Sequence, residues 1–260
     1  MPIRRSDIQK QFAATAPGYA ASDCHAHGAT LQVLVELAQV QAGDWVLDLA
    51  TGTAHSAMAL PPAAGVVVGL DLTLAMMREG RAMADERGLG HLRFVAGDAQ
   101  ELPFADAAFD RVVSRIAPHH FLDIGAALRE VRRVLRPGGR FAMIDNSTPG
   151  DPVTDLFVDT LERLHDPTHV RAYSPAEWRS LCREAGLTVL EVREDLYDVL
   201  GGRSMAEWAA RSHCTAEVVA KMSVMMRNAP PEVKEALRIR ERGFDIYFDM
   251  PRVGLAAMKA

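Results

Sequence analysis

The most distinct pattern in the chain is a short apolar segment that ends in a turn of small residues. Val46, Leu47 and Leu49 form a run typical of a strand buried on both faces. Small residues fill positions 50–53, and from His55 the pattern becomes helical. A strand, a tight turn and a helix in this order direct backbone N–H groups and the positive end of a helix dipole at one point. This stretch therefore predicts a binding site for a carboxylate or a phosphate.

Strand-like and helix-like patterns alternate through the segment around this turn. Further strands are predicted at 66–70, 92–95, 109–114 and 140–145, and helices at 73–87 and 125–135. Alternation of this kind is the signature of an α/β fold, in which helices cover both faces of a mostly parallel sheet.

The two ends of the chain are less regular. Residues 1–22 are expected to form a weakly specified arm that is helical in parts, and a single helix is expected over 22–40. Near the C-terminus we predict helices at 155–165, 175–185, 205–211, 216–227 and 231–240, and strands at 188–192, 244–248 and 253–258. Because no repeat or linker divides the chain, we expect residues 1–260 to form one domain.

Composition and charge exclude several classes of protein. Hydrophobic residues make up 48% and charged residues 24%, the net charge is −5 and the pI is about 6.0, so we expect no nucleic-acid partner. The chain has neither a signal-peptide pattern nor an apolar run long enough to span a membrane. Its three cysteines are far apart, which favours a reduced compartment. We expect a cytoplasmic protein, either monomer or homodimer, without a membrane partner.

Charged side chains follow the predicted strands. Asp71 lies nineteen residues after Gly52, close to the spacing of about 20 at which nucleotide-binding α/β folds place an acid for ribose hydroxyls. In such folds ligands bind outside the carboxyl ends of the strands. The other charged residues at such ends are Asp98, Arg115 and Asp145. A dinucleotide-dependent oxidoreductase remains an alternative, but His55 occupies the place of the third glycine that its motif requires.

Several segments resemble one enzyme family. The arrangement Asp48-x-Ala50-x-Gly52-x-Ala54 is similar to the first motif of Rossmann-like (class I) methyltransferases that depend on S-adenosylmethionine (SAM), with two glycines replaced by alanine. Residues 94–114, 116–121 and 130–141 continue this resemblance. It covers roughly residues 40–147 and is strongest to the branch that contains the C-methyltransferases of ubiquinone and menaquinone biosynthesis.

The resemblance implies a fold, a cofactor and its binding residues. The fold is a mostly parallel seven-stranded sheet with an antiparallel last strand and a helical lid. Residues 1–40 form an arm and helix, 41–147 the SAM-binding core, and 203–240 the helical insertion over the pocket. Asp71 is expected to bind the ribose, Asp98 and Ala99 the adenine, with Leu72 and Met76 beside the ring. The remaining cofactor residues are expected to be Asp48, Ala50, Thr51, Gly52 and Arg115.

The acceptor of the methyl group is expected to be a small molecule that offers an oxygen, a nitrogen or a carbon. His119 and His120 follow the fourth strand, and one of them, by preference His119, is a candidate general base. The acceptor is further expected to contact Tyr19, Asp145 and Met222, the last from a methionine-rich lid helix. No metal site is expected. A SAM-binding regulator without catalytic activity and an NAD(P)-dependent oxidoreductase are the alternatives.

Overall fold

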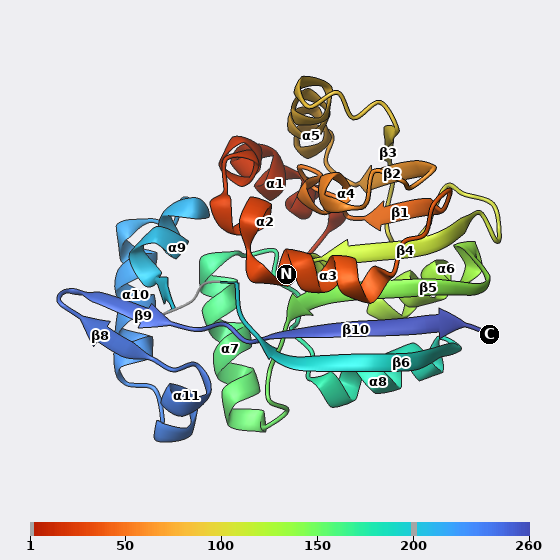
Figure 1. Cartoon of the computed structure of the whole chain (residues 1–260). Helices are drawn as coiled ribbons and strands as arrows, with labels where there is room; N and C mark the ends of the chain where they lie inside the picture. Colours follow the sequence, from red (N-terminus) through yellow and green to blue (C-terminus); the bar gives the residue numbers. More distant parts are fainter. Residues whose placement is uncertain (1–2, 199–201) are drawn as a thin grey trace.

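A seven-stranded sheet forms the centre of the molecule (Figure 1). The computed structural model describes residues 3–198 and 202–260. The strands lie in the order β3-β2-β1-β4-β5-β10-β6. Their bounds are β1 Trp45–Leu49, β2 Val66–Asp71, β3 Leu92–Ala96, β4 Phe109–Arg115, β5 Leu135–Asn146, β6 Leu187–Leu196 and β10 Arg252–Lys259. The first five pair in parallel, and β10 is antiparallel to both neighbours, which confirms the predicted fold class.

Helices cover both faces of this sheet. Because side chains alternate along a strand, Leu47 and Leu49 of β1 face one layer, and Val46 and Asp48 face the other. The first layer contains α6 (Ile124–Val134) and α8 (Pro175–Glu184). The second contains α3 (Ala29–Ala38), α4 (His55–Ala59) and α5 (Leu74–Glu86). This two-sided burial explains why β1 appears in the sequence as a continuous apolar run.

The N-terminal region is more regular than the sequence predicted. Residues 5–20 form one helix, α1 (Arg5–Ala20), rather than a loosely ordered arm. The helix predicted over 22–40 is broken into α2 (Asp23–His27) and α3. The break lies at Gly28, where a Cβ atom would overlap the carbonyl oxygen of Cys24. A side chain is excluded there because it would collide with the last turn of α2.

The C-terminal helices form a second apolar cluster beside the sheet. These helices are α7 (Pro152–His165), α9 (Met205–Arg211), α10 (Ala216–Arg227) and α11 (Pro231–Ala236). They pack with a three-stranded sheet of order β7-β9-β8, whose bounds are β7 Arg203–Ser204, β8 Arg240–Arg242 and β9 Asp245–Phe248. The sequence predicted β9 but missed β7 and β8, which are too short to show a pattern. In the part of the chain described, no helix combines the length and apolar character that a membrane crossing requires.

Candidate functional site

A cleft with about 960 Å³ of empty space, its mouth included, opens at the carboxyl ends of the parallel strands. This edge of the sheet is where ligands of such folds bind. Most of the predicted cofactor residues line the cleft: Ala50, Thr51, Gly52, Asp71, Leu72, Met76, Asp98, Ala99 and Arg115. The fold therefore brings together residues that are up to 65 positions apart in the sequence.

The turn after β1 has an unusual backbone. Ala50, Gly52 and Ala54 all have a positive φ, of 55°, 54° and 65°. Such a conformation costs an alanine roughly 1–2 kcal/mol, which explains why glycine is the ordinary residue in these places. Ala54 does not line the cleft. Its methyl group faces α5, where a Cβ atom at Gly80 would come within 3.2 Å of it. The alanine thus packs the turn against α5 and leaves the ligand side free.

Asp48 supports this turn from inside. Its Oδ2 accepts hydrogen bonds from Thr51 Oγ1 at 2.6 Å and from the amide of Ala57 at 3.1 Å. The side chain is 1% exposed, and burial raises its pKa to about 7. Asp48 does not line the cleft, so the prediction that it contacts the cofactor is corrected: it fixes the loop that does.

Asp71 ends β2 and faces the cleft. Its two carboxylate oxygens accept from the amides of Gly52 and Thr73, each at 2.8 Å. Burial raises its pKa, while these two amides oppose that rise. A carboxylate can accept about four hydrogen bonds, so Asp71 can also accept from a ligand that lies in the cleft. The side chain therefore both ties the turn to β2 and keeps the capacity to bind a diol.

Helix α1 covers the adjoining end of the cleft. Arg5 forms an ion pair with Asp98, and Gln9 Nε2 donates to the carbonyl oxygen of Leu72 at 3.0 Å. Ile8 and Phe12 line the cleft from the same helix face. The sequence analysis missed these four residues. The spacing of Ile8 and Phe12, four residues apart, was the available signal.

Four aromatic rings, two of them from α1, line part of the cleft. Phe12 packs edge-on against Tyr19 and His120, with ring centroids 5.7 Å and 5.0 Å apart, and Tyr19 lies 5.0 Å from His25. All four residues line the cleft. Tyr19, for which the sequence predicted an acceptor contact, therefore lines the cleft. His25 was missed, and no pattern in the sequence distinguishes it from His27.

The structure separates the roles of the two adjacent histidines. His120 lines the cleft, and its Nδ1 lies 3.0 Å from the carbonyl oxygen of Thr168. A carbonyl can only accept, so Nδ1 carries the proton and Nε2 keeps a lone pair. Burial lowers the pKa of His120 to about 3, which keeps the ring neutral at physiological pH.

His119 lies behind His120 and does not line the cleft. Its Nδ1 is 2.6 Å from Asp145 Oδ1, and its ring centroid is 4.2 Å from that of His120. Burial lowers the pKa of His119 and raises that of Asp145 to about 7. The predictions that His119 and Asp145 contact the acceptor are therefore corrected: they form a buried pair that supports His120.

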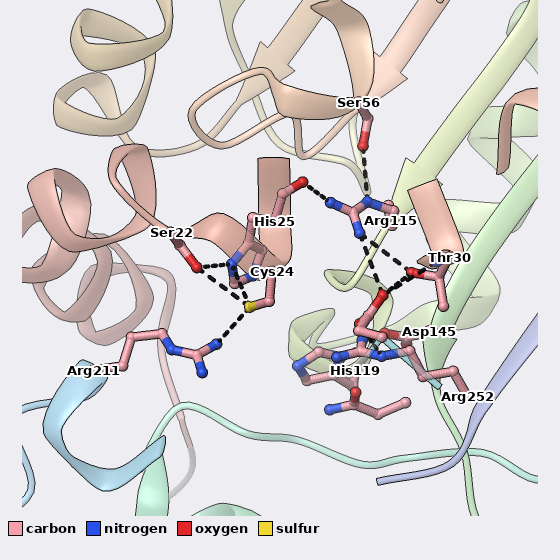
Figure 2. A network of polar contacts seen from close by, with 12 residues as sticks. Ser22, Cys24, His25, Thr30, Ser56, Arg115, His119, Asp145, Arg211 and Arg252 are labelled. Carbon is pink, nitrogen blue, oxygen red and sulfur yellow. Dashed lines mark hydrogen bonds and ion pairs between the residues drawn. The ribbon is translucent and has the colours of Figure 1, made fainter. Parts of the chain in front are cut away.

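The prediction that Met222 contacts the acceptor is also corrected. It is fully buried in the C-terminal cluster with Trp208 and Phe248, because α10 turns this face toward α7 and the small sheet. The residues described as lining the cleft include none from 202–240, so the predicted lid over the pocket is not formed by this segment. The segment 202–240 is connected to the cleft only through a neighbouring residue, among the contacts described. Arg211 of α9 donates to Cys24 Sγ at 3.2 Å, next to His25 (Figure 2).

Known proteins similar to this chain are methyltransferases or share their fold. The profile of a family described as "Methyltransferase domain" matches residues 47–143. The uncharacterized methyltransferase YcgJ of Bacillus subtilis is 31% identical over 95% of this chain and 97% of its own. The crystal structure of YcgJ superimposes with a TM-score of 0.81 over 88% of this chain and 97% of that chain.

Two further relatives match shorter parts. The uncharacterized protein YafE of Escherichia coli is 38% identical over 68% of this chain and 84% of its own. A demethylmenaquinone methyltransferase of Corynebacterium kroppenstedtii is 40% identical, over 46% of this chain and 50% of its own. The likeness to the quinone enzymes is thus confined to about half of each chain.

The residues of the cleft fit SAM. The Asp71 carboxylate faces it, Asp98 and Ala99 lie at the next strand end, and Arg115 supplies a cation near the turn after β1. These features match the diol, the adenine and the carboxylate of that molecule. The chain belongs to the Rossmann-like, SAM-dependent methyltransferases, and SAM is its methyl donor.

Proposed function

We propose that the chain transfers a methyl group from SAM to an oxygen, nitrogen or carbon atom of a small molecule bound beside His120. The observation that carries this proposal is the position of α1. Arg5 and Gln9 fix this helix over the cleft, and its Phe12 and Tyr19 form an aromatic wall with His120, against which the acceptor binds. A space bounded by Phe12, Tyr19 and His120 suits a small, partly apolar molecule better than a polymer.

The cofactor and the chain have different roles in the reaction. Bound SAM supplies an electrophilic methyl group on a sulfonium. The chain holds the acceptor in line and excludes water, and such positioning can contribute about 7–11 kcal/mol. His120 Nε2 accepts a hydrogen bond from the acceptor's O–H or N–H. An oxygen that gains a methyl group before losing its proton becomes far more acidic than an imidazolium, so even a histidine of lowered pKa takes that proton.

Further parts of this proposal concern the chain as a whole. We treat residues 1–260 as one catalytic unit, which the match to YcgJ along nearly the whole of both chains supports. Cys24, Cys182 and Cys214 are all unpaired thiols, as a reduced cytoplasm allows. The net charge of −5 supports action without nucleic acid.

A transfer assay tests the function directly. The purified chain is incubated with methyl-labelled SAM and a panel of phenols, quinones and amines, and label is counted in the organic product. We expect transfer to at least one class. SAM binding by calorimetry without transfer to any compound of a broad panel would favour a SAM-binding regulator, and binding of NAD(H) in place of SAM would contradict both.

Helix α1 and helix α2 are expected to be protected by the cofactor. Because Ile8, Phe12, Tyr19 and His25 line the cleft, bound SAM should stabilise both helices against local opening. We expect amide hydrogen exchange in residues 5–27 to slow several-fold with saturating SAM, whereas α10, which does not line the cleft, serves as the internal control. Equal exchange in 5–27 with and without SAM would show that α1 does not close over the cofactor.

A further inference from the structure

The segment that follows α7 places a carboxylate beside His120. Helix α7 ends at His165, because the residue before Pro167 is restricted to an extended backbone. Asp166 has this conformation, with φ −135° and ψ 107°. Its Oδ1 accepts from the amide of Thr168 at 2.8 Å and from Thr168 Oγ1 at 2.6 Å. This turn fixes the carboxylate to the residue that orients His120.

Asp166 is a buried carboxylate that lacks an ion-pair partner. It is 4% exposed. Burial would raise its pKa, but the attraction of His120 and the two hydrogen bonds from Thr168 lower the pKa on balance, so Asp166 is ionised at neutral pH. In the described ranges 3–198 and 202–260, no arginine or lysine forms an ion pair with it, whereas Asp159, two turns earlier in α7, pairs with Arg163.

The hydrogen bonds between His120 and Asp166 have a defined direction. An ionised carboxylate can only accept, so Thr168 Oγ1 donates its proton to Asp166. The lone pairs of Oγ1 are then left for His120 Nδ1, which lies 3.3 Å from Oγ1 and 3.0 Å from the Thr168 carbonyl oxygen. Both oxygens of Thr168 therefore accept from Nδ1–H, and the lone pair of His120 is on Nε2.

Other ionisable groups also act on His120 or its neighbours: His119, Asp145, Asp159, Glu162, His169 and Arg252. His119 and His169 disfavour a positive charge on His120. Burial raises the pKa of Asp145 to about 7 and also raises that of Glu162. Asp159 is ionised, but it already pairs with His169 and Arg163. Asp166 is therefore the ionised carboxylate beside His120 whose charge is not yet balanced.

The surroundings of Asp166 do not balance this charge either. His165 lies beside it, and burial lowers the pKa of His165 to about 3, so that ring is neutral. Arg203 and Arg211 act on His165, but neither forms an ion pair with Asp166 in the part of the chain described. The C-terminal end of α7 adds the negative end of a helix dipole at the same place. The potential next to His120 is therefore negative.

Methyl transfer to an O–H or N–H group brings one positive charge onto the acceptor. As the bond from the methyl carbon to the acceptor atom forms and the bond to sulfur breaks, the acceptor loses its proton to His120 Nε2 and keeps the bonding pair. The charge of the sulfonium thus becomes the charge of an imidazolium, and the total is unchanged. A buried imidazolium is costly without a counter-charge.

We propose that Asp166 is a positioning residue for His120: it acts through Thr168 to hold Nδ1–H in place, and its carboxylate balances the charge that His120 gains with the acceptor's proton. This inference rests on the proposed function, for acceptors that offer an O–H or N–H group. It also explains a carboxylate at the C-terminal end of α7, where the helix dipole disfavours one.

Replacing Asp166 with asparagine removes the charge and keeps the turn. The asparagine oxygen can accept the same two hydrogen bonds from Thr168. With an acceptor from the transfer assay and saturating SAM, we expect kcat of Asp166→Asn to fall about 10- to 100-fold, because His120 becomes a weaker base. The KM for the acceptor and the affinity for SAM should stay within about threefold of the wild type. Calorimetry with SAM also shows that the variant is folded.

Two further variants show whether the effect passes through His120. Asp159→Asn is the matched control: its carboxylate accepts from His169 Nε2 at 2.8 Å and from the amide of Ala172 at 3.1 Å, and the same substitution there should leave kcat within about threefold. The double variant His120→Ala/Asp166→Asn should be no slower than His120→Ala, within about threefold, because the two residues act as a unit.

NMR of the chain labelled with ¹⁵N in histidine and bound to S-adenosylhomocysteine gives a readout that needs no acceptor. The spectrum of His120→Ala assigns the signals of His120. We expect the tautomer with Nδ1–H in the wild type and in Asp166→Asn. The Nδ1–H proton resonance should move upfield in Asp166→Asn, because the carboxylate no longer polarises this hydrogen bond through Thr168. Asp159→Asn should leave this resonance in place.

Three results would overturn the proposal. A kcat of Asp166→Asn within about threefold of the wild type, or an unmoved Nδ1–H resonance, would show that Asp166 only closes the turn after α7. A further loss in the double variant would show that Asp166 acts on another part of the site. A wild-type chain that transfers no methyl group would instead contradict the proposed function, and the NMR comparison would still decide whether Asp166 acts on His120.

Discussion

Replacing His120 with alanine is expected to lower kcat by about 10²–10⁴ at saturating SAM, the usual contribution of a positioned general base. His120 lines the cleft beside Phe12, and the Thr168 carbonyl oxygen fixes its protonated Nδ1, so the lone pair of Nε2 is free for the acceptor. The alanine variant loses both the proton acceptor and the hydrogen bond that orients the substrate. Turnover of an acceptor found in the transfer assay provides the measurement.

Comparison with His119 makes this prediction specific. His119→Ala removes a ring that does not line the cleft, so kcat should fall less than in His120→Ala. Because burial lowers the pKa of His120 to about 3, the ring is neutral from pH 6 to 9, and the ratio of wild-type to variant kcat should be constant over that range. If both variants stay within about threefold of the wild type, neither histidine is a base, and positioning alone accounts for the rate.

Replacing Asp71 with alanine is expected to weaken SAM binding by about 100-fold. Each hydrogen bond to a charged group contributes about 1.5–3 kcal/mol, and about 1.4 kcal/mol corresponds to a tenfold change in affinity. The variant would lose the acceptor for the ribose hydroxyls and also the bonds from the amides of Gly52 and Thr73. Calorimetric titration with SAM measures the effect.

Two control variants distinguish the loss of a ligand contact from a general disturbance of the fold. Asp71→Asn keeps one acceptor oxygen and the side-chain shape, so its loss of affinity should be smaller than that of the alanine variant. Asp85→Ala removes an exposed carboxylate of α5, the helix that follows Asp71, and should leave SAM affinity unchanged. An unaltered SAM affinity in Asp71→Ala would contradict the ribose assignment.

Much of the cofactor half of the site could be predicted from the sequence. Its determinants are local: a strand buried on both faces, a turn of small residues and an acid at the next strand end. Parallel strands place their carboxyl ends at one edge, so Ala50, Gly52, Asp71 and Asp98 had to converge once β1, β2 and β3 were recognised. The antiparallel β10 was expected only through the family resemblance.

The acceptor half was decided by tertiary structure. Nothing in the sequence distinguishes His119 from His120. The choice is made by Thr168, 48 residues away, whose carbonyl oxygen turns His120 toward the cleft, and by Asp145, which holds His119 behind it. A methionine on an amphipathic helix fits a substrate lid as well as a core, and only the packing of α10 places Met222 in the core.

Patterns in the sequence thus determined the sheet and its cofactor edge, because these depend on strand order and short-range spacing, and the family resemblance indicated the class of reaction. The sequence did not determine the cover formed by α1 or the ion pairs around Arg115. Both depend on contacts between distant segments: Arg5 with Asp98, and Arg115 with Asp198 and Arg252. A sequence does not show which distant charged residues form ion pairs. The ion pairs, and which charges are buried, are therefore defined only by the folded structure.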